Sequence, residues 1–384
     1  MRIACVGGGP AGLYFAISLK LRAPEHDIVV YERKEADAAE GWGVTFAPDF
    51  LGRLRLNDPA SAREIERNTL SWSRQYVCIR EERIPYDNGV EVHNLYRPRL
   101  VGILAARASE LGIRVEYGTE VSAGPDADLV VAADGVSSRI RDSGDFGTTM
   151  RLSHDKYIWL GTDKPFDAFA YHFVRTDSGW LWASTYGVAS ELGTFVAHCA
   201  PETWSGLGFD AMSASDCLTA LEGIFKEQLD GHRLMGRVGD ATDIRWLSFR
   251  NVTSRRWHDG NVVLLGDSAH TTHFSAGMGT TLAVESAIAL ADSVYRHSDL
   301  EQALLAYQRQ RVAEMRASDK EAVRSGQFFA NVSRYIDLEP ARFATFVHAR
   351  RSWMLPLFPP RTYYALHQMR RRVSRVEFGV PPSE

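Results

Sequence analysis

The sequence RIACVGGGPAG at residues 2–12 decides the fold of the N-terminal part of the chain. Residues 2–6 are an apolar run that predicts a short buried strand, and the glycines at 7–9 predict a tight turn. Apolar residues at helical spacing follow at 11–21, and a β-branched run at 27–31 predicts a second strand. A strand–helix–strand unit of about 30 residues predicts a parallel, doubly wound sheet.

Three of these glycines, Gly7, Gly9 and Gly12, form a GxGxxG motif between the strand and the helix. The first glycine of such a motif permits the turn, the second lets the backbone approach a pyrophosphate, and the third lets helix and strand pack closely. Glu32 follows Gly12 by 20 positions, where a carboxylate can accept hydrogen bonds from ribose hydroxyls. These features predict a dinucleotide site but do not distinguish FAD from NAD. The alternative is a plain tight turn beside a surface glutamate.

The composition is that of a soluble α/β protein. Of the 384 residues, 45% are hydrophobic and 24% are charged, and the net charge of −4 gives no reason to expect nucleic acid or a membrane as partner. Four cysteines are scattered without a CxxC pair or metal-ligand spacing: Cys5, Cys78, Cys199 and Cys217. No apolar run approaches membrane-spanning length, and the strand at 2–6 leaves no room for a signal peptide. We therefore expect a cytoplasmic protein.

The pattern changes between residues 151 and 250. Short aromatic-rich segments separated by turn residues predict an antiparallel sheet, with strands at 156–161, 169–175, 180–186 and 194–199. A helix is expected at 214–228. This stretch is therefore expected to be a sheet domain inserted into the nucleotide-binding domain.

The dinucleotide-type pattern resumes after the insertion, with a buried strand at 261–265 and a helix at 278–295. We expect a discontinuous nucleotide-binding domain made of residues 1–150 and 251–300. The inserted sheet domain is expected at 151–250, and a helical C-terminal region at 301–384. Within the first part, 97–111 predicts a helix and the glycine-rich stretch 41–44 predicts a loop.

Two further motifs make the pattern specific: DLVVAADGVSSRIR at 128–141 and VVLLGDSAH at 262–270. They resemble the DG and GD motifs of the class A, single-component FAD-dependent aromatic monooxygenases, the family that includes para-hydroxybenzoate hydroxylase. RPRL at 97–100 matches that family's Arg-x-x-Leu helix start. The resemblance extends over about residues 1–300, and it implies FAD as the cofactor.

The resemblance also implies roles for individual residues. In this family the GD aspartate, here Asp267, binds the FAD ribityl chain near the pyrophosphate, and the arginine of the helix start, here Arg97, lies near the cofactor. The glycine-rich segment at 277–281 lies under the flavin at a helix N-terminus, where amides can stabilise the negative charge of a reduced flavin. The expected cofactor-binding residues are Gly7, Gly9, Pro10, Ala11, Gly12, Glu32, Arg33, Gly43, Val44, Arg97, Asp134, Asp267, Gly277, Gly279, Thr280 and Thr281.

Two positions depart from the family pattern. The family usually has proline where this chain has Phe274, and it tends to have asparagine where Thr281 stands. These changes, with 41–44 and 156–159, are similar to a narrower subgroup. It contains the salicyloyl-CoA 5-hydroxylases, the anthraniloyl-CoA monooxygenases and the indole hydroxylase of violacein biosynthesis, a pathway of secondary metabolism.

The resemblance implies hydroxylation of an electron-rich aromatic ring with NAD(P)H and O2 through a flavin 4a-hydroperoxide. No second glycine fingerprint is present, so NAD(P)H is expected to bind transiently as a co-substrate. The substrate is expected to be either a salicyloyl- or anthraniloyl-type thioester or a free indole, phenol or heteroaromatic compound. A flavin-binding module without turnover is the alternative from another class.

The substrate is expected to lie between the inserted sheet and the flavin. Candidate lining residues are Trp42, Phe46, Trp182, Ser184, Tyr186, His273 and Phe274, and ordinary core packing is the alternative for each aromatic side chain. No single catalytic acid or base stands out.

Other interpretations are weaker. GDSAH lacks the final glycine of a GxSxG nucleophile elbow, and WLW at 180–182 lacks the Ile-Pro that would complete a flavin-dependent halogenase motif. His270 and His273 have no carboxylate or cysteine at ligand spacing, so no metal is expected. Seven arginines lie between 350 and 375, which predicts either a solvated or oligomer-facing helix or a patch for the phosphates of CoA or a carrier-protein arm: Arg350, Arg351, Arg361, Arg370, Arg371, Arg372 and Arg375.

Overall fold

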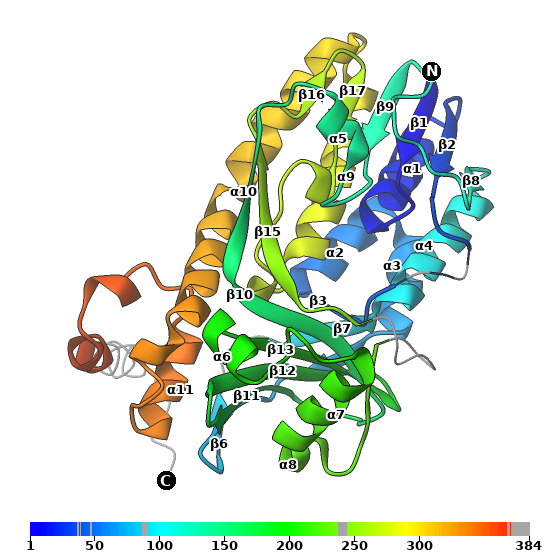
Figure 1. Ribbon diagram of the computed structural model, residues 1–384. Helices are drawn as coiled ribbons and strands as arrows, with labels where there is room; N and C mark the ends of the chain where they lie inside the picture. Colours follow the sequence, from blue (N-terminus) through cyan, green and yellow to red (C-terminus); the bar gives the residue numbers. More distant parts are fainter. Residues whose placement is uncertain are drawn as a thin grey trace, which may run out of the picture.

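The computed structural model describes residues 1–36, 38, 40–46, 48–86, 91–236, 244–366 and 369. Two large sheets lie at opposite ends of the molecule, and the long strands β10 (Thr148–Thr162) and β15 (Leu247–Ser254) run between them (Figure 1). The long helix α10 (Leu300–Ala330) extends from the first sheet toward the second. This arrangement leaves the functional site between the two sheets.

The first sheet is a parallel nucleotide-binding sheet, with one antiparallel edge pair between β16 and β17. Its strands lie in the order β16 (His258–Asp259), β17 (Val262–Leu264), β9 (Leu129–Ala132), β1 (Arg2–Val6), β2 (Asp27–Tyr31) and β8 (Arg114–Glu116). β9 is apolar and buried along its whole length, and β1 is buried from Ile3 onward, as is typical of parallel strands that are covered on both faces. The doubly wound fold predicted from the sequence is confirmed.

Helices pack against this sheet and against one another. α1 (Pro10–Arg22) and α9 (Gly279–Arg296) pack closely against each other, and α4 (Arg97–Glu110) packs beside α1. The first turn of α1 follows the glycine turn directly, so Gly12 must lie against strand β1. α2 (Pro48–Asn57) and α3 (Pro59–Arg67) complete this part of the molecule.

The loop predicted at 41–44 is wrong in its second half. β3 (Gly43–Phe46) begins there and pairs with β7 (Val92–Tyr96), which also pairs with β4 (Leu70–Trp72). Gly43 is tightly packed, because an added Cβ would lie 2.4 Å from the Tyr186 ring. The glycine therefore marks a close approach to the second sheet, and its presence does not break the strand.

The second sheet carries the predicted strands of the insertion. Its order is β14 (Leu234–Met235), β10, β13 (Leu192–Cys199), β12 (Gly179–Ala189), β11 (Phe169–Thr176), β5 (Gln75–Ile79) and β6 (Glu82–Tyr86), with β15 paired to β10. The sheet is antiparallel except for the parallel pair β11–β5. It therefore recruits two strands from before residue 150, which the predicted domain boundary assigns to the nucleotide-binding part.

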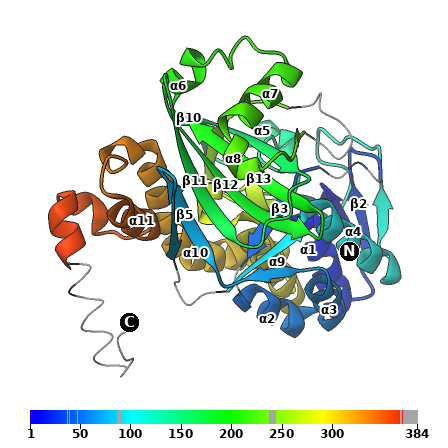
Figure 2. The same cartoon turned by 90° about the horizontal axis from the view of Figure 1, so that it is seen from below.

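The two faces of this sheet have different neighbours. Alternate residues of one face, among them Leu160, Phe195 and Ala197, pack against α6 (Pro201–Gly206), α7 (Ala214–Ile224) and α8 (Lys226–Leu229). These helices lie on the side away from the first sheet (Figure 2). The single helix expected at 214–228 is interrupted at Phe225, whose buried ring packs on Phe195. The other face of the sheet is turned toward the nucleotide-binding part.

The C-terminal region is helical, as expected. After α10 come a short turn at η3 (Val332–Arg334), α11 (Pro340–His348) and η4 (Leu355–Leu357). Aromatic side chains from this region, including Phe329 and Phe343, form a second core with Tyr171 and Phe173 of β11. α11 lies beside β5 and α10 (Figure 2). No helix in the described part of the chain is long and apolar enough to cross a membrane.

Candidate active site

A cavity of about 1330 Å³ lies between the nucleotide-binding part and the second sheet. It reaches from the glycine turn before α1 to the aromatic face of the sheet and to the residues after α11. Pockets for drug-sized ligands typically measure about 300–1,000 Å³. The cavity therefore has room for a dinucleotide and a second, smaller molecule.

The glycine turn has the geometry that a pyrophosphate requires. Gly7 has a φ of 113°, and a Cβ on it would lie 2.3 Å from the Ala133 carbonyl oxygen, so only glycine fits. A Cβ on Gly12 would lie 2.1 Å from the Gly7 carbonyl oxygen. A Cβ on Gly9 would meet nothing within 4 Å, and Gly9 lines the cavity. Gly7 and Gly12 are therefore packed tightly against protein atoms, whereas Gly9 leaves open space toward the cavity.

The start of α1 is free to bind an anion. Gly9 is the N-cap residue and has no side chain to bond the first amides of the helix, and Pro10 and Ala11 also line the cavity. Unpaired amides at a helix N-terminus, together with the helix dipole, favour a phosphate. The residues present therefore fit the pyrophosphate of FAD.

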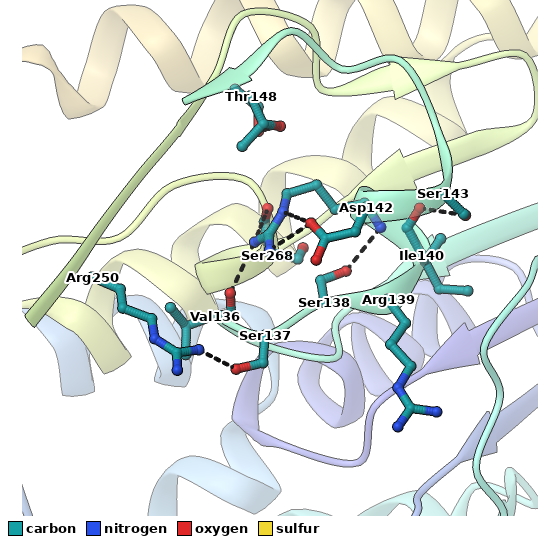
Figure 3. A network of polar contacts seen from close by, with 12 residues as sticks. Val136, Ser137, Ser138, Arg139, Ile140, Asp142, Ser143, Thr148, Arg250 and Ser268 are labelled. Carbon is teal, nitrogen blue, oxygen red and sulfur yellow. Dashed lines mark hydrogen bonds and ion pairs between the residues drawn. The ribbon is translucent and has the colours of Figure 1, made fainter. Parts of the chain in front are cut away.

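The DG and GD motifs are joined by the buried side chain of Arg141, which lies on α5 (Arg139–Ser143). Figure 3 shows its partners Val136, Asp142 and Ser268 close together. Its Nη1 donates to the carbonyl oxygens of Val136, at 3.0 Å, and Ser268, at 3.4 Å. Its Nε donates to Asp142, at 2.9 Å. One guanidinium thus fixes the two turns relative to each other, a role that the sequence alone did not reveal.

Glu32 and Asp134 lie at the edge of the site and bond to the backbone. The Glu32 carboxylate accepts from the amides of Gly8, at 2.7 Å, and Lys34, at 2.9 Å. One oxygen of Asp134 accepts from the Arg139 amide at 2.9 Å and so caps α5, while its other oxygen is buried without a partner among the described residues. Both carboxylates shape the turns that surround the predicted nucleotide site.

Asp267 and Arg97 form the charged centre of the cavity. Both line it, and the Asp267 carboxylate is exposed to it. The surrounding protein raises the pKa of Asp267, and the nearby Arg97 and His270 charges oppose that rise. Burial lowers the pKa of Arg97, and the charges of Asp267 and Glu40 oppose this. Each charge therefore offsets part of the cost of burying the other.

The glycine-rich turn at 277–281 also reaches the cavity. Gly277 adopts a φ of 65°, in the left-handed region, and ends the short turn η2 (Phe274–Ala276). α9 then begins at Gly279 with no side-chain cap on its first amides. Uncapped amides that face a cavity can stabilise negative charge.

Most of the expected cofactor residues line the cavity, and five do not. Those at its wall are Gly9, Pro10, Ala11, Gly43, Val44, Arg97, Asp267, Gly277, Gly279, Thr280 and Thr281. Those outside it are Gly7, Gly12, Glu32, Arg33 and Asp134. Of these five, Gly7 and Gly12 shape the turn, and Arg33 is exposed at the surface.

The substrate half of the cavity is the inner face of the second sheet. Strand register puts Tyr157 opposite His198, and Ser184 opposite both Val196 and Tyr171. Because side chains alternate along a strand, these residues share one face. All five line the cavity, together with Phe46, Trp159, Phe169, Tyr186, Phe249, Phe274 and Phe329.

His198 is a buried polar residue in the wall of this chamber. Its ring packs against Trp182, Phe274 and Phe329, with centroids 5.8, 4.9 and 6.1 Å away. The ring nitrogens have no hydrogen bond to any described residue. Burial lowers the pKa of His198 to about 3, with a smaller contribution from His273. The imidazole is therefore neutral at neutral pH and can donate or accept a hydrogen bond.

The structure does not bring three of the expected substrate residues to the cavity. Trp42 is buried under β10, where its Nε1 donates to the Gly236 carbonyl oxygen at 3.1 Å. Trp182 belongs to the second core, and its ring stacks on the ring of its cross-strand neighbour His198. His273 bonds to Ser275 at 2.8 Å and packs on Phe249. The first two fill gaps in the protein interior, as the packing alternative predicts, and the third is held within its own turn.

Several cavity residues were not predicted, although the sequence contained a signal for some of them. Tyr157 and Trp159 lie in the segment 156–159, and alternation along that strand puts them on one face. His198 gave no signal, because its position depends on the register of β13 with its neighbours. The described residues contain no cluster of three or more metal-binding side chains.

The seven C-terminal arginines do not form one surface. Arg350 and Arg351 line the cavity, and Arg361 is exposed. Arg370, Arg371, Arg372 and Arg375 lie outside the described residues. The patch predicted for phosphates is therefore not seen as a unit, and two of its members lie inside the protein.

Comparison with known proteins agrees with this geometry. The family described as FAD binding domain matches residues 1–320. The chain is 32% identical to a salicyloyl-CoA 5-hydroxylase of a Streptomyces species, over 99% of this chain and 71% of the relative. It is 33% identical to a 3-hydroxy-4-methyl-anthranilyl aryl-carrier-protein 5-monooxygenase of Streptosporangium sibiricum, over 80% of this chain and 83% of the relative.

Two further comparisons extend the same result. The chain is 28% identical to a protodeoxyviolaceinate monooxygenase of Chromobacterium violaceum, over 93% of this chain and 96% of the relative. The solved structure of a 2-methyl-3-hydroxypyridine-5-carboxylic acid oxygenase superposes with a TM-score of 0.72 and 21% identity, covering 89% of this chain and 96% of the other. At that identity the structural likeness shows the fold.

Proposed function

The chain belongs to the FAD binding domain family, and from this we propose that it is an FAD-dependent monooxygenase that hydroxylates an electron-rich aromatic ring with NAD(P)H and O2. The observation that carries the proposal is the single cavity that joins the glycine turn and Asp267 to the aromatic face of the second sheet. A flavin-binding module without turnover would not need a lined chamber beside the flavin-binding turn. The three relatives named above are hydroxylases or monooxygenases.

The cavity lining supports an assignment of the residues that would hold FAD. The open side of Gly9 and the first amides of α1 would receive the pyrophosphate, and Asp267, as the family resemblance implies, would accept hydrogen bonds from the ribityl hydroxyls. The uncapped start of α9 would favour negative charge on a bound flavin. When bound, FAD supplies the two-electron chemistry that takes a hydride from NAD(P)H and activates O2.

The second sheet supplies the substrate chamber. Its aromatic side chains exclude water and stack against a ring, while Tyr157, Ser184 and His198 offer a few polar groups. A pocket that is mainly apolar, with few convergent polar groups, binds and orients a small aromatic molecule. His198 and Tyr157 lie beside Phe274, where the chamber meets the flavin turn. They are placed to hydrogen-bond a hydroxyl or amino group on the ring.

The polar groups of the chamber and the names of the relatives both indicate which aromatic compounds are candidate substrates. Phenols, anilines and indoles carry the donor that such polar groups recognise, and two relatives are named for acting on salicyloyl and anthranilyl groups held as a thioester or on a carrier protein. A thioester and a free aromatic compound are therefore both candidates for this chain. Hydroxylation of a free indole-type compound is the second candidate, and the relative from Chromobacterium violaceum favours it.

Replacing His198 with phenylalanine tests the role of this side chain. We expect the His198→Phe protein to keep its FAD, because the ring contacts with Trp182, Phe274 and Phe329 are retained. The KM for a phenol or aniline substrate should rise about 10-fold, because a hydrogen bond to the ring substituent is lost. Because the pKa of His198 is about 3, the effect should be the same from about pH 6 to about pH 9.

His232→Phe is the matched control for that variant, because His232 lies outside the cavity and its side chain is 38% exposed. It should leave the KM unchanged. An equal KM in His198→Phe and the unaltered protein would show that His198 does not contact the substrate.

The proposed function is tested by measuring NADH or NADPH oxidation and O2 uptake together. We expect both to accelerate when the right aromatic compound is added, across a panel of salicyloyl-CoA, anthraniloyl-CoA, indoles and free phenols. A flavin-binding module would bind FAD and show no acceleration with any of these compounds.

A further inference from the structure

Two arginines that follow α11, Arg350 and Arg351, form part of the cavity wall. Arg350 is only 7% exposed, and Arg351 is half-buried. Arginine is rarely buried unless its charge is paired, because removing a guanidinium from water costs several kcal/mol, as an order of magnitude. The position of two such charges at a ligand cavity therefore calls for a physical explanation.

Protein groups satisfy these guanidinium groups only in part. Arg350 Nη1 donates to the Val347 carbonyl oxygen at 3.0 Å, and its guanidinium lies over the Tyr171 ring, 5.2 Å from the centroid. Arg351 Nη2 donates to the Ala276 carbonyl oxygen at 2.6 Å. The Nε atoms of both arginines are buried and have no hydrogen-bond partner in the described part of the chain. The Tyr86 hydroxyl also interacts with the Arg350 guanidinium and helps to raise the pKa of Arg350. Both side chains are thus held in place, and each still has one N–H group without an acceptor in the described part of the chain.

The charge balance points the same way. Glu321, 3.8 Å from Arg351 Nη1, forms an ion pair with Arg351, and its side chain is 46% exposed. No carboxylate in the described part of the chain forms an ion pair with Arg350. A third arginine, Arg324, donates to the Arg351 carbonyl oxygen at 3.5 Å. Burial lowers the pKa of Arg351, and the charge of Arg350 lowers it further. An anion in the cavity would relieve this excess of positive charge.

The position of Arg351 limits which anionic group of the substrate could bind to it. It bonds to Ala276, which directly precedes Gly277 at the start of the glycine-rich turn. An anion held there lies close to the reacting ring. The phosphates of CoA or of a carrier-protein arm are separated from the acyl group by the length of the pantetheine chain, so they would lie too far from the ring to contact Arg351. A carboxylate on the ring or on a short side chain would reach the Arg351 guanidinium.

We propose that Arg350 and Arg351 bind a carboxylate of the substrate, so that the enzyme takes an aromatic acid in its free, ionised form. The proposal rests on the proposed function for the identity of the ring chamber, and it narrows the substrate class within that function. Planar guanidinium groups bind carboxylates with two parallel charge-assisted hydrogen bonds, which also fixes the orientation of the ring.

The experiment measures ligand binding to the FAD-loaded protein through the change in the flavin absorption spectrum. The probes are matched pairs of acid and amide: salicylate with salicylamide, anthranilate with anthranilamide, and indole-3-carboxylate with indole-3-carboxamide. We expect at least one acid to bind at least about 10-fold more tightly than its amide. Arg351→Gln should remove that preference, and Arg350→Lys, which keeps the charge of the more deeply buried residue, should reduce it partly.

Arg361→Gln is the control, because Arg361 is exposed on the same segment; it should keep the preference. The proposal is overturned if no acid of the three pairs binds better than its amide, or if Arg351→Gln weakens acid and amide equally while FAD stays bound. Because the readout is binding, it separates the two proposals. A preference for the acids without hydroxylation of any ring compound would contradict the proposed function and leave the carboxylate site standing.

Discussion

Gly9→Ala should weaken FAD binding by up to about 100-fold while leaving the protein folded. The backbone of Gly9 is in an extended conformation that alanine also adopts, with φ −77° and ψ 179°, and an added Cβ would meet no protein atom within 4 Å. The methyl group would instead enter the space that the pyrophosphate occupies. Overpacking of a close contact costs about 1–3 kcal/mol, up to about 100-fold in the dissociation constant. Titration of the FAD-free protein with FAD measures the effect.

Two other glycines give opposite controls for this variant. Gly102→Ala lies in α4 with nothing near its Cβ, so both FAD binding and the melting temperature should be retained. Gly12→Ala should instead damage the fold, because its Cβ would lie 2.1 Å from the Gly7 carbonyl oxygen. It should cost about 3 kcal/mol or more of unfolding free energy. If Gly9→Ala bound FAD normally, the pyrophosphate would not lie at this turn.

Asp267→Ala should raise the dissociation constant for FAD by up to about 100-fold, since hydrogen bonds to a charged group contribute about 1.5–3 kcal/mol. Asp267 lines the cavity between the glycine turn and the start of α9. Asp267→Asn keeps the shape of the side chain and removes its charge. Its dissociation constant for FAD should lie between those of the unaltered protein and Asp267→Ala. Flavin fluorescence on titration with FAD distinguishes the three proteins.

The choice of control for Asp267 matters. Asp142 also follows a family motif, but it pairs with the buried Arg141 that fixes both turns, so removing it would disturb the site (Figure 3). Asp210 is exposed and lies outside the cavity, and Asp210→Ala should bind FAD as the unaltered protein does. Equal FAD binding by Asp267→Ala and Asp210→Ala would contradict the assignment of Asp267.

The nucleotide-binding part was predictable because its signals are local. After a charged first residue, the strands at 2–6 and 27–31 consist of apolar residues and one tyrosine, and the structure has them at those bounds. The turn between β1 and α1 is specified by glycines, and two of them, Gly7 and Gly12, leave no space for a Cβ. Each prediction depended on neighbouring residues in the sequence.

The substrate side was harder to predict because it depends on pairing between distant strands. β5, from before residue 150, joins the second sheet by a parallel pairing with β11, and no local pattern marks that pairing. His198 enters the chamber only because β13 pairs with β10 in one register. Trp42 and Trp182 looked like ring-binding residues by type, yet both fill the interior. Residue type alone does not separate a cavity wall from a core.

The C-terminal arginines show the same limit. Their number suggested a charged surface, but Arg350 and Arg351 turn inward beside Tyr171 and the Ala276 carbonyl oxygen. That orientation follows from the packing of α11 on the second sheet, through contacts such as that between Phe343 and Phe173. The packing of α11 on the second sheet sets the position of this segment, and that position determines where its arginines point.

The central claim is that the protein inserts an oxygen atom from O2 into an aromatic ring at the expense of NAD(P)H. The direct test is turnover under isotopically labelled O2 with the aromatic compound that accelerates NAD(P)H oxidation, followed by mass analysis of the product. The account predicts a hydroxylated product that carries the label, formed in an amount equal to the NAD(P)H consumed. An unlabelled product, or NAD(P)H oxidation that forms hydrogen peroxide and leaves every ring compound unchanged, would contradict it.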